Sequence, residues 1–257
     1  MELLYGAYRM GPDKLGETLA QLRGELTPEL AQQALRDYHA AVGRQDADGA
    51  IAAATIASRI FNFIGHREDA FNALVDYFYV LFMLAETEAA YADVYTALRQ
   101  VLAGDPYGEG SPLTGLRALM LAADGGFFAC EAAADEARKK HWLQAALESL
   151  EDGAKYLGGA GTAELIPSYA STAVAVYRRC VKNGWVGEAW AAARLAAVTQ
   201  ALDRAAPGKV SYPGDIAKTA NIDEARAEMS GLYNRGAYAG ERRSGESLSG
   251  LFGRKGG

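Results

Sequence analysis

Apolar residues recur every three or four positions through most of the first 205 residues. This spacing puts them on one face of a helix, and no segment alternates apolar and polar residues over five or more positions. We therefore expect helices and essentially no strand. The helices that the pattern predicts cover residues 12–23, 28–44, 50–64, 68–85, 88–103, 112–123, 127–139, 141–157, 162–182 and 185–205.

Capping and breaking residues place the helix ends. Thr27 and Ser111 each precede a proline, which combines an N-cap side chain with the residue best tolerated at the first helical position. The runs Asp124-Gly125-Gly126 and Asn183-Gly184 are typical of helix stops. Pro167 predicts a kink or a new start in the segment that contains it.

Composition supports the same fold class. The chain has 257 residues, and it contains 51 Ala against 7 Ile and 11 Val. Alanine loses no side-chain entropy in a helix, whereas β-branched residues favour sheets. We predict an all-α protein, an α-solenoid or array of helical hairpins.

The amino-acid composition of the chain changes near Pro207. Residues 206–257 contain 10 glycines, with eight basic and six acidic residues, whereas residues 1–205 hold 18 basic and 26 acidic ones. A short helix over 222–233 is expected there. The predicted organisation is an N-terminal segment with a short helix (1–26), a helical-hairpin domain (27–205) and a Gly-rich C-terminal arm (206–257).

Small residues early in the second helix of each predicted pair allow two helices to cross closely. The last pair shows it best, with one apolar face formed by Ala173, Val176, Tyr177 and Cys180. The corresponding alanines are Ala50, Ala90, Ala146 and Ala189, at spacings of 40, 56 and 43 residues.

Such pairs resemble tetratricopeptide hairpins over residues 27–205, although the repeat of that family is about 34 residues long. Its Trp/Leu/Gly/Tyr pattern is kept in no pair. An Ala-rich helical bundle without a true repeat fits the same residues. The third hairpin would join residues 127–139 to 141–157.

The resemblance implies a superhelical scaffold that binds peptides or protein surfaces on the face lined by the first helices. The alternative for each side chain on that face is an ordinary solvated surface. The groove residues that the resemblance implies are Asn72, Asp76, Tyr79, Glu131, Asp135, Arg138, Arg178 and Lys182.

The end of the chain combines apolar anchors with basic residues. Such a segment can dock into another subunit or lie on an anionic surface and order on contact, or it can be an unstructured solubilising end. The predicted contact residues of this arm are Arg242, Arg243, Leu248, Leu251, Phe252, Arg254 and Lys255.

Catalytic and metal-binding patterns are missing from the sequence. No H-E-x-x-H, CxxC or G-x-S-x-G motif occurs, and the glycine-rich run 158–161 lacks the residues of a phosphate loop. We expect neither catalytic activity nor a bound metal or cofactor. Cys130 and Cys180 lie in apolar helical patterns, which favours reduced, structural thiols.

The formal net charge of −6 argues against direct nucleic-acid binding, which needs a basic footprint. The most apolar stretch, residues 71–85, is too short to span a membrane and contains an Asp. The opening residues lack a secretory pattern, so the cytoplasm is the expected compartment.

The function expected from these patterns is a non-catalytic scaffold or adaptor that binds protein partners through its helical surface and its C-terminal arm. The alternative is a structural subunit of a large assembly, whose arm laces into neighbouring subunits. Either one allows an oligomer or a larger complex.

Overall fold

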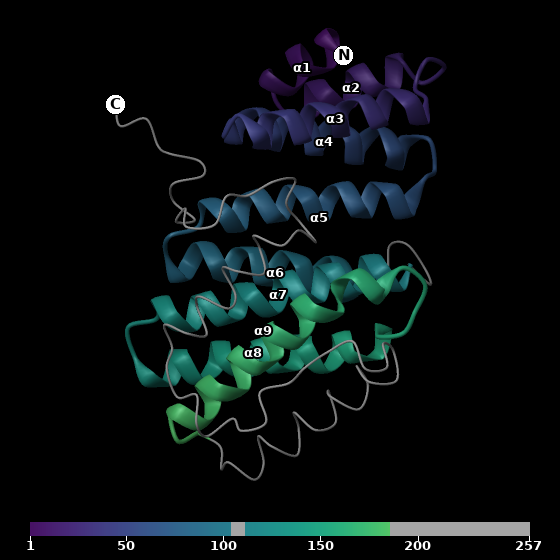
Figure 1. The fold of residues 1–257 in the computed structure, drawn as a ribbon. Helices are drawn as coiled ribbons and strands as arrows, with labels where there is room; N and C mark the ends of the chain where they lie inside the picture. Colours follow the sequence, from purple (N-terminus) through teal and green to yellow (C-terminus); the bar gives the residue numbers. More distant parts are fainter. Residues whose placement is uncertain (104–110, 186–257) are drawn as a thin grey trace. The chain divides into compact units, whose positions relative to one another are not determined.

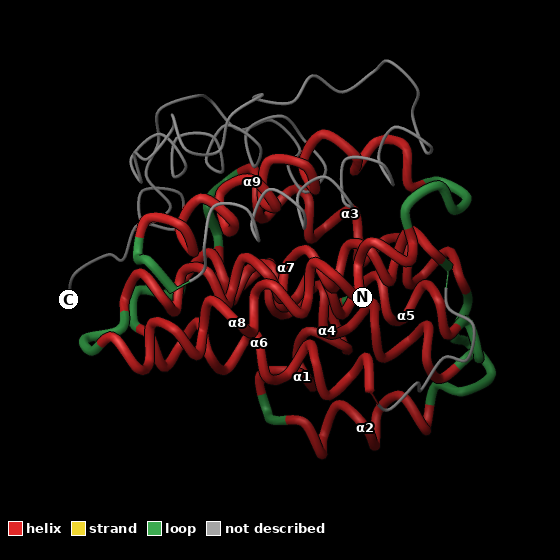
Figure 2. Tube along the Cα trace, turned by 90° about the horizontal axis from the view of Figure 1, so that it is seen from below, coloured by secondary structure: helices red, strands yellow, loops and turns green. Residues whose placement is uncertain are grey.

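The computed structural model describes residues 1–103 and 111–185. Within these ranges every regular element is a helix, as predicted (Figures 1 and 2). The described residues divide into two compact units, 1–84 and those from 85 to 185. Neighbouring helices pack against each other in each unit, and each unit contains a hydrophobic core cluster.

The first unit contains five helices among its described residues. Helix α3 packs against α4, α4 packs against α5, and α1 contacts both α2 and α4. Small and aliphatic side chains make its core, including Ala34, Ala57 and Ile60, which lie on facing sides of α3 and α4. The helices are α1 (Glu2–Arg9), α2 (Pro12–Gln21), α3 (Pro28–Gly43), α4 (Ala47–Phe63) and α5 (Arg67–Leu84).

In the second unit, α7 lies between α6 and α8 and also contacts α9. Phe127, Leu150 and Tyr169 belong to its core cluster. The elements are α6 (Glu88–Ala103), α7 (Pro112–Ala132), α8 (Glu136–Gly153), the short 3-10 turns η1 (Ala154–Tyr156) and η2 (Thr162–Leu165), and α9 (Ile166–Lys182).

Several predicted helix ends are confirmed. The hydroxyl of Thr27 accepts the Leu30 N–H at 3.3 Å, with Pro28 as the first residue of α3. Helix α9 starts beside Pro167 and stops before Gly184, whose φ of 66° is the left-handed conformation that suits glycine. The predicted apolar face of α9 from Ala173 to Cys180 is buried in the core.

The predicted break at Asp124-Gly125-Gly126 is wrong, because α7 runs through it. A Cβ at Gly126 would meet the Ala146 nitrogen and the Trp142 carbonyl oxygen of α8 at 3.0 Å. On the side of α6, a Cβ at Gly125 would lie 3.4 Å from the Tyr91 carbonyl oxygen. Gly126 therefore lets α7 and α8 approach closely, and packing outweighs the weak helix propensity of both glycines.

The third predicted hairpin is also wrong. The helix ends at Ala132, Ala133 is extended, and the Asp135 carboxylate caps α8 by accepting the Arg138 N–H at 2.9 Å. The short helix expected in residues 1–26 is present as α2, but α1 was not predicted because it has only two buried residues, Leu4 and Ala7.

The second predicted pair is divided between the two units, since α5 ends the first and α6 belongs to the second. The helices predicted over 185–205 and 222–233 lie outside the described residues, as does the C-terminal arm.

Among the described helices, α7 is long and apolar enough to cross a membrane by length and composition. However, 83% of its most apolar window is buried inside the structure. That degree of burial is typical of a core helix.

Candidate functional site

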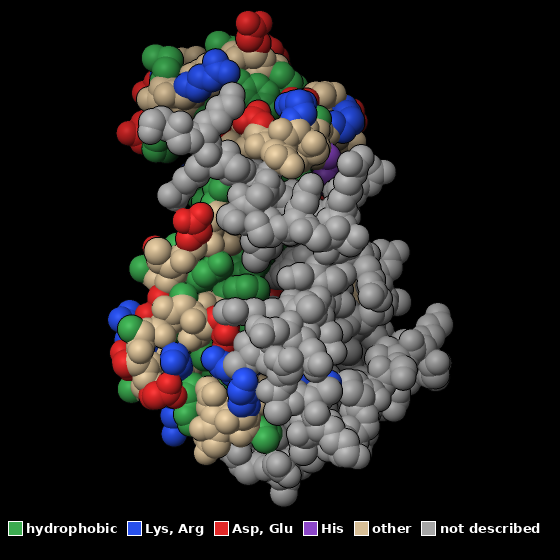
Figure 3. Space-filling view, turned by 60° about the vertical axis from the view of Figure 1, so that its left-hand side comes forward, with side chains coloured by type: hydrophobic (Ala, Val, Ile, Leu, Met, Phe, Trp, Pro, Cys, Tyr) green, Lys and Arg blue, Asp and Glu red, His purple; other side chains and the backbone are tan. Residues whose placement is uncertain are grey.

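A pocket of about 500 Å³ opens in the first unit between α1, α3 and the start of α4. Figure 3 shows side chains of both charges on the surface of the N-terminal helices. The pocket, called here the α1/α3/α4 pocket, is lined by Tyr5, Tyr8, Arg9, Asp37, Ala40, Ala41, Arg44, Asp46, Asp48, Gly49 and Ala52.

The sequence of α1 orients two phenols toward this pocket. Leu4 and Ala7 are buried in the core of the first unit and hold the short helix in place. Tyr5 and Tyr8 are three residues apart, so they are neighbours on the helix surface, and both line the pocket.

Tyr5 faces a carboxylate of α3. Its hydroxyl donates to Asp37 Oδ2 at 3.0 Å, and the Gln33 amide donates to Asp37 Oδ1, also at 3.0 Å. Burial raises the pKa of the Tyr5 phenol, and the hydrogen bond and charge of Asp37 raise it further. Tyr5 is therefore a neutral donor at any physiological pH.

Tyr8 lies near a carboxylate of α4. Burial raises the pKa of its phenol, and the nearby Tyr77 and Asp48 add to this shift. Asp48 is exposed and forms no ion pair within the described residues. The pocket thus contains two phenols, one of them hydrogen-bonded to Asp37, together with the exposed carboxylate of Asp48.

The turn between α3 and α4 forms the third side. Asp46 caps α4 by accepting the Gly49 N–H at 2.9 Å, and Arg44 lies 4.0 Å from its other oxygen. A Cβ at Gly49 would meet this carboxylate in its present position, so a larger residue there would shift the exposed Asp46 side chain. The Asp46 carboxylate therefore contacts both the N-terminus of α4 and Arg44.

The residues predicted for a groove are distributed over both units. Tyr79 is only 2% exposed and Arg178 only 4%, so the expectation that their side chains lie on the surface is wrong. The reason is that three consecutive residues of α5 (78–80) and four of α9 (175–178) are buried, which is more than one face of a helix. Asn72 and Asp76 are half-buried, and Lys182 is exposed.

The other predicted groove residues hold helices together or start them. Arg138 Nε donates to Glu88 at 2.8 Å, and Trp142 Nε1 donates to the same oxygen at 2.7 Å, which joins α8 to the first turn of α6. Glu131 pairs with Arg179 at 2.7 Å with little exposure. Asp135 is the N-cap of α8.

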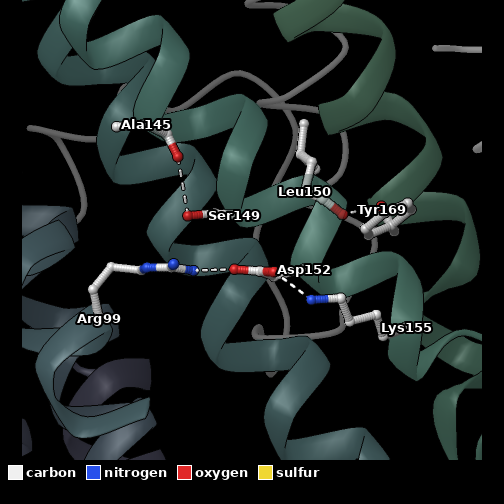
Figure 4. A network of polar contacts seen from close by, with 7 residues as sticks. All are labelled: Arg99, Ala145, Ser149, Leu150, Asp152, Lys155 and Tyr169. Carbon is white, nitrogen blue, oxygen red and sulfur yellow. Dashed lines mark hydrogen bonds and ion pairs between the residues drawn. The ribbon is translucent and has the colours of Figure 1, made fainter. Parts of the chain in front are cut away.

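A second set of polar contacts ties α6, α8 and α9 (Figure 4). Asp152 accepts from Arg99 at 2.9 Å and from Lys155 at 2.7 Å, and the Tyr169 hydroxyl donates to the Leu150 carbonyl. Burial by itself would raise the pKa of Asp152, but Lys155 and Arg99 outweigh it and lower that pKa.

The two cysteines are free and buried in the core of the second unit. Burial raises the pKa of Cys130 to about 11 and that of Cys180 to about 12. Both thiols are therefore protonated at neutral pH, in line with the structural role predicted for them.

Within the described ranges, no group of three or more His, Cys, Asp or Glu residues is placed to hold a metal ion. The predicted arm residues, from Arg242 to Lys255, lie outside the described residues.

No protein family, no curated protein and no solved structure matches this chain. The function is therefore argued from the geometry of the described residues.

Sequence reasoning missed the α1/α3/α4 pocket. The available signal was local: two tyrosines three apart in an unpredicted helix, and three aspartates between residues 37 and 48. The contact of α1 with α4 and the hydrogen bond from Tyr5 to Asp37 of α3 bring these two segments together.

Proposed function

We propose that this chain is a non-catalytic scaffold or adaptor that binds protein partners in the cytoplasm. The observation that carries the proposal is the α1/α3/α4 pocket, a concavity with charged and phenolic groups held by packed helices. Its volume of about 500 Å³ falls in the range of pockets that enclose a small molecule, about 300–1,000 Å³, which is also enough for one side chain of a partner. Because the lining helices are already packed against each other, less entropy is lost when a ligand binds.

The finer architecture belongs to the same proposal. We propose that the helices continue as a tetratricopeptide-like solenoid and that the C-terminal arm is a second contact. Of the predicted groove, the exposed Lys182 forms no ion pair within the described residues, whereas Asp135 caps α8 and Arg138 pairs with Glu88. Tyr79 and Arg178 do not enter it, since both are buried.

The test is affinity purification of the tagged full chain from its native cells, with quantitative mass spectrometry. We expect a defined partner whose recovery falls at least about fivefold with Asp48→Asn. The matched control is Glu68→Gln, which removes one carboxylate from an exposed position of α5 without a described ion pair. Equal recovery with both variants, or turnover of a substrate by the chain alone, would contradict the proposal.

A further inference from the structure

We propose that the α1/α3/α4 pocket binds the guanidinium group of an arginine side chain in a partner polypeptide. This inference rests on the proposed function and names the chemistry of the partner at one site. It depends on the phenols and carboxylates that line the pocket and on the net charge of the lining residues. It also depends on the N-terminus of α4, which the Asp46 side chain already caps.

The phenols and carboxylates come from three helices and converge on one cavity. Tyr5 donates a hydrogen bond to Asp37, and Tyr8 and Asp48 line the same cavity. Aromatic rings attract cations through the negative charge density of their faces, and carboxylates attract them directly. Two phenols and two carboxylates that line one cavity therefore favour a cation as its ligand.

The charge of the pocket is not cancelled by its own residues. Asp37 is hydrogen-bonded by Tyr5 and Gln33, which are neutral donors and leave its negative charge in place. Asp48 has no ion pair within the described residues. Arg44 is close to Asp46, so Arg9 is the remaining cation among the lining residues.

An anionic ligand fits the pocket less well. The start of α4 would attract an anion through its free N–H groups, but the Asp46 carboxylate already accepts the Gly49 N–H there. Asp48, which has no ion pair within the described residues, would also repel an incoming carboxylate or phosphate. The geometry therefore points to a cation.

Among biological cations, the guanidinium group fits best. It is planar, stacks on tyrosine rings and can donate two parallel hydrogen bonds to one carboxylate, whereas an ammonium group is a strongly hydrated point charge. The cavity of about 500 Å³ also leaves space for the backbone on both sides of the arginine.

The test uses the full chain and blocked tripeptides, followed by the backbone amide NMR shifts of Tyr5, Tyr8 and Asp48. The probe is Gly-Arg-Gly, and its neutral isostere carries citrulline in place of arginine. We expect saturable shifts with the arginine peptide and binding at least about tenfold weaker with citrulline. Equal binding of the two, tighter binding of Gly-Glu-Gly, or shifts confined to other residues would overturn the proposal.

Two variants with opposite expected effects on binding distinguish a change in the pocket from a general loss of folding. Asp48→Asn should weaken the arginine peptide about tenfold with at most a small fall in melting temperature, because its side chain is exposed and only its favourable charge in the first turn of α4 is lost. Arg9→Gln should tighten binding about twofold, because it removes a competing cation, and a damaged fold cannot produce that gain. Tighter binding by Asp48→Asn, or weaker binding by Arg9→Gln at an unchanged melting temperature, would contradict the inference.

The two proposals fail in different ways. A partner that is lost with Asp48→Asn, together with no binding of the arginine peptide, overturns the guanidinium site and leaves the scaffold function supported. Binding of the arginine peptide without any captured partner overturns the scaffold function, while the pocket's preference for a guanidinium is supported.

Discussion

Gly126 lies at a close approach of α7 and α8, with backbone atoms of Trp142 and Ala146 opposite its Cα. Gly125, its neighbour, faces α6 at ordinary van der Waals distance. Asp124 is also buried in this turn, where its carboxylate accepts a hydrogen bond from the Thr172 hydroxyl of α9 at 3.2 Å. Asp124, Gly125 and Gly126 thus each face a different helix, namely α9, α6 and α8 in that order.

Gly126→Ala should lower the free energy of unfolding by about 1–3 kcal/mol, because backbone atoms of α8 cannot move aside as a flexible side chain would. The matched control is Gly125→Ala, which has space for a methyl group and should be neutral or stabilising by up to about 1 kcal/mol through its higher helix propensity. Chemical denaturation of both variants checks this. The same loss at both positions would show that the crossing does not depend on Gly126.

At the scale of elements, polar side chains set how the helices of the second unit pack. Glu88 receives Arg138 and Trp142 from α8, and Asp152 receives Arg99 from α6. These contacts connect both ends of α8 to α6, beside the apolar core. Residues that we assigned to a binding surface, such as Arg138, therefore also hold helices together.

Asp152 predicts an acid-dependent loss of stability. Its pKa is lowered in the folded protein, so the stability that it contributes is present above the unfolded value of about 3.9 and is lost as pH falls through the lower folded value. Asp152→Asn should therefore lower the free energy of unfolding at pH 7 by up to about 1 kcal/mol, a small figure because the side chain is partly exposed. Below about pH 4 the difference from the unchanged protein should shrink.

Urea denaturation at pH 7 and at pH 3 measures this difference. The control is Asp93→Asn, an exposed carboxylate of α6 without a described ion pair. A pH-independent deficit in Asp152→Asn, or an equal effect of Asp93→Asn, would contradict the role of the Arg99 and Lys155 contacts.

At the scale of the whole molecule, the described chain has two units, each with a hydrophobic cluster of its own. Ala57 is fully buried in the first cluster, and Ala146 is fully buried in the second. Alanine at such positions sets the distance between helices, because a larger side chain would push them apart.

Because each unit has a hydrophobic cluster of its own, we expect a destabilising substitution to increase local opening mainly in the unit that contains it. Ala57→Leu should speed amide hydrogen exchange mainly in residues 1–84, and Gly126→Ala should speed it mainly in the described residues from 85 to 185. Hydrogen-exchange mass spectrometry with peptide resolution measures both. An equal increase in both units from either variant would mean that the two units open together.

The sequence by itself determined the all-α fold class, most helix positions and the caps at Thr27 and Gly184, because helical periodicity and capping are properties of a few neighbouring residues. It also identified the core face of α9 and the buried thiols. Only the tertiary structure decided that Gly125 and Gly126 continue a helix, that Tyr79 and Arg178 are buried, and that α1 joins α3 and α4 around a pocket. These outcomes depend on contacts between segments far apart in the chain, where packing overrides local propensity.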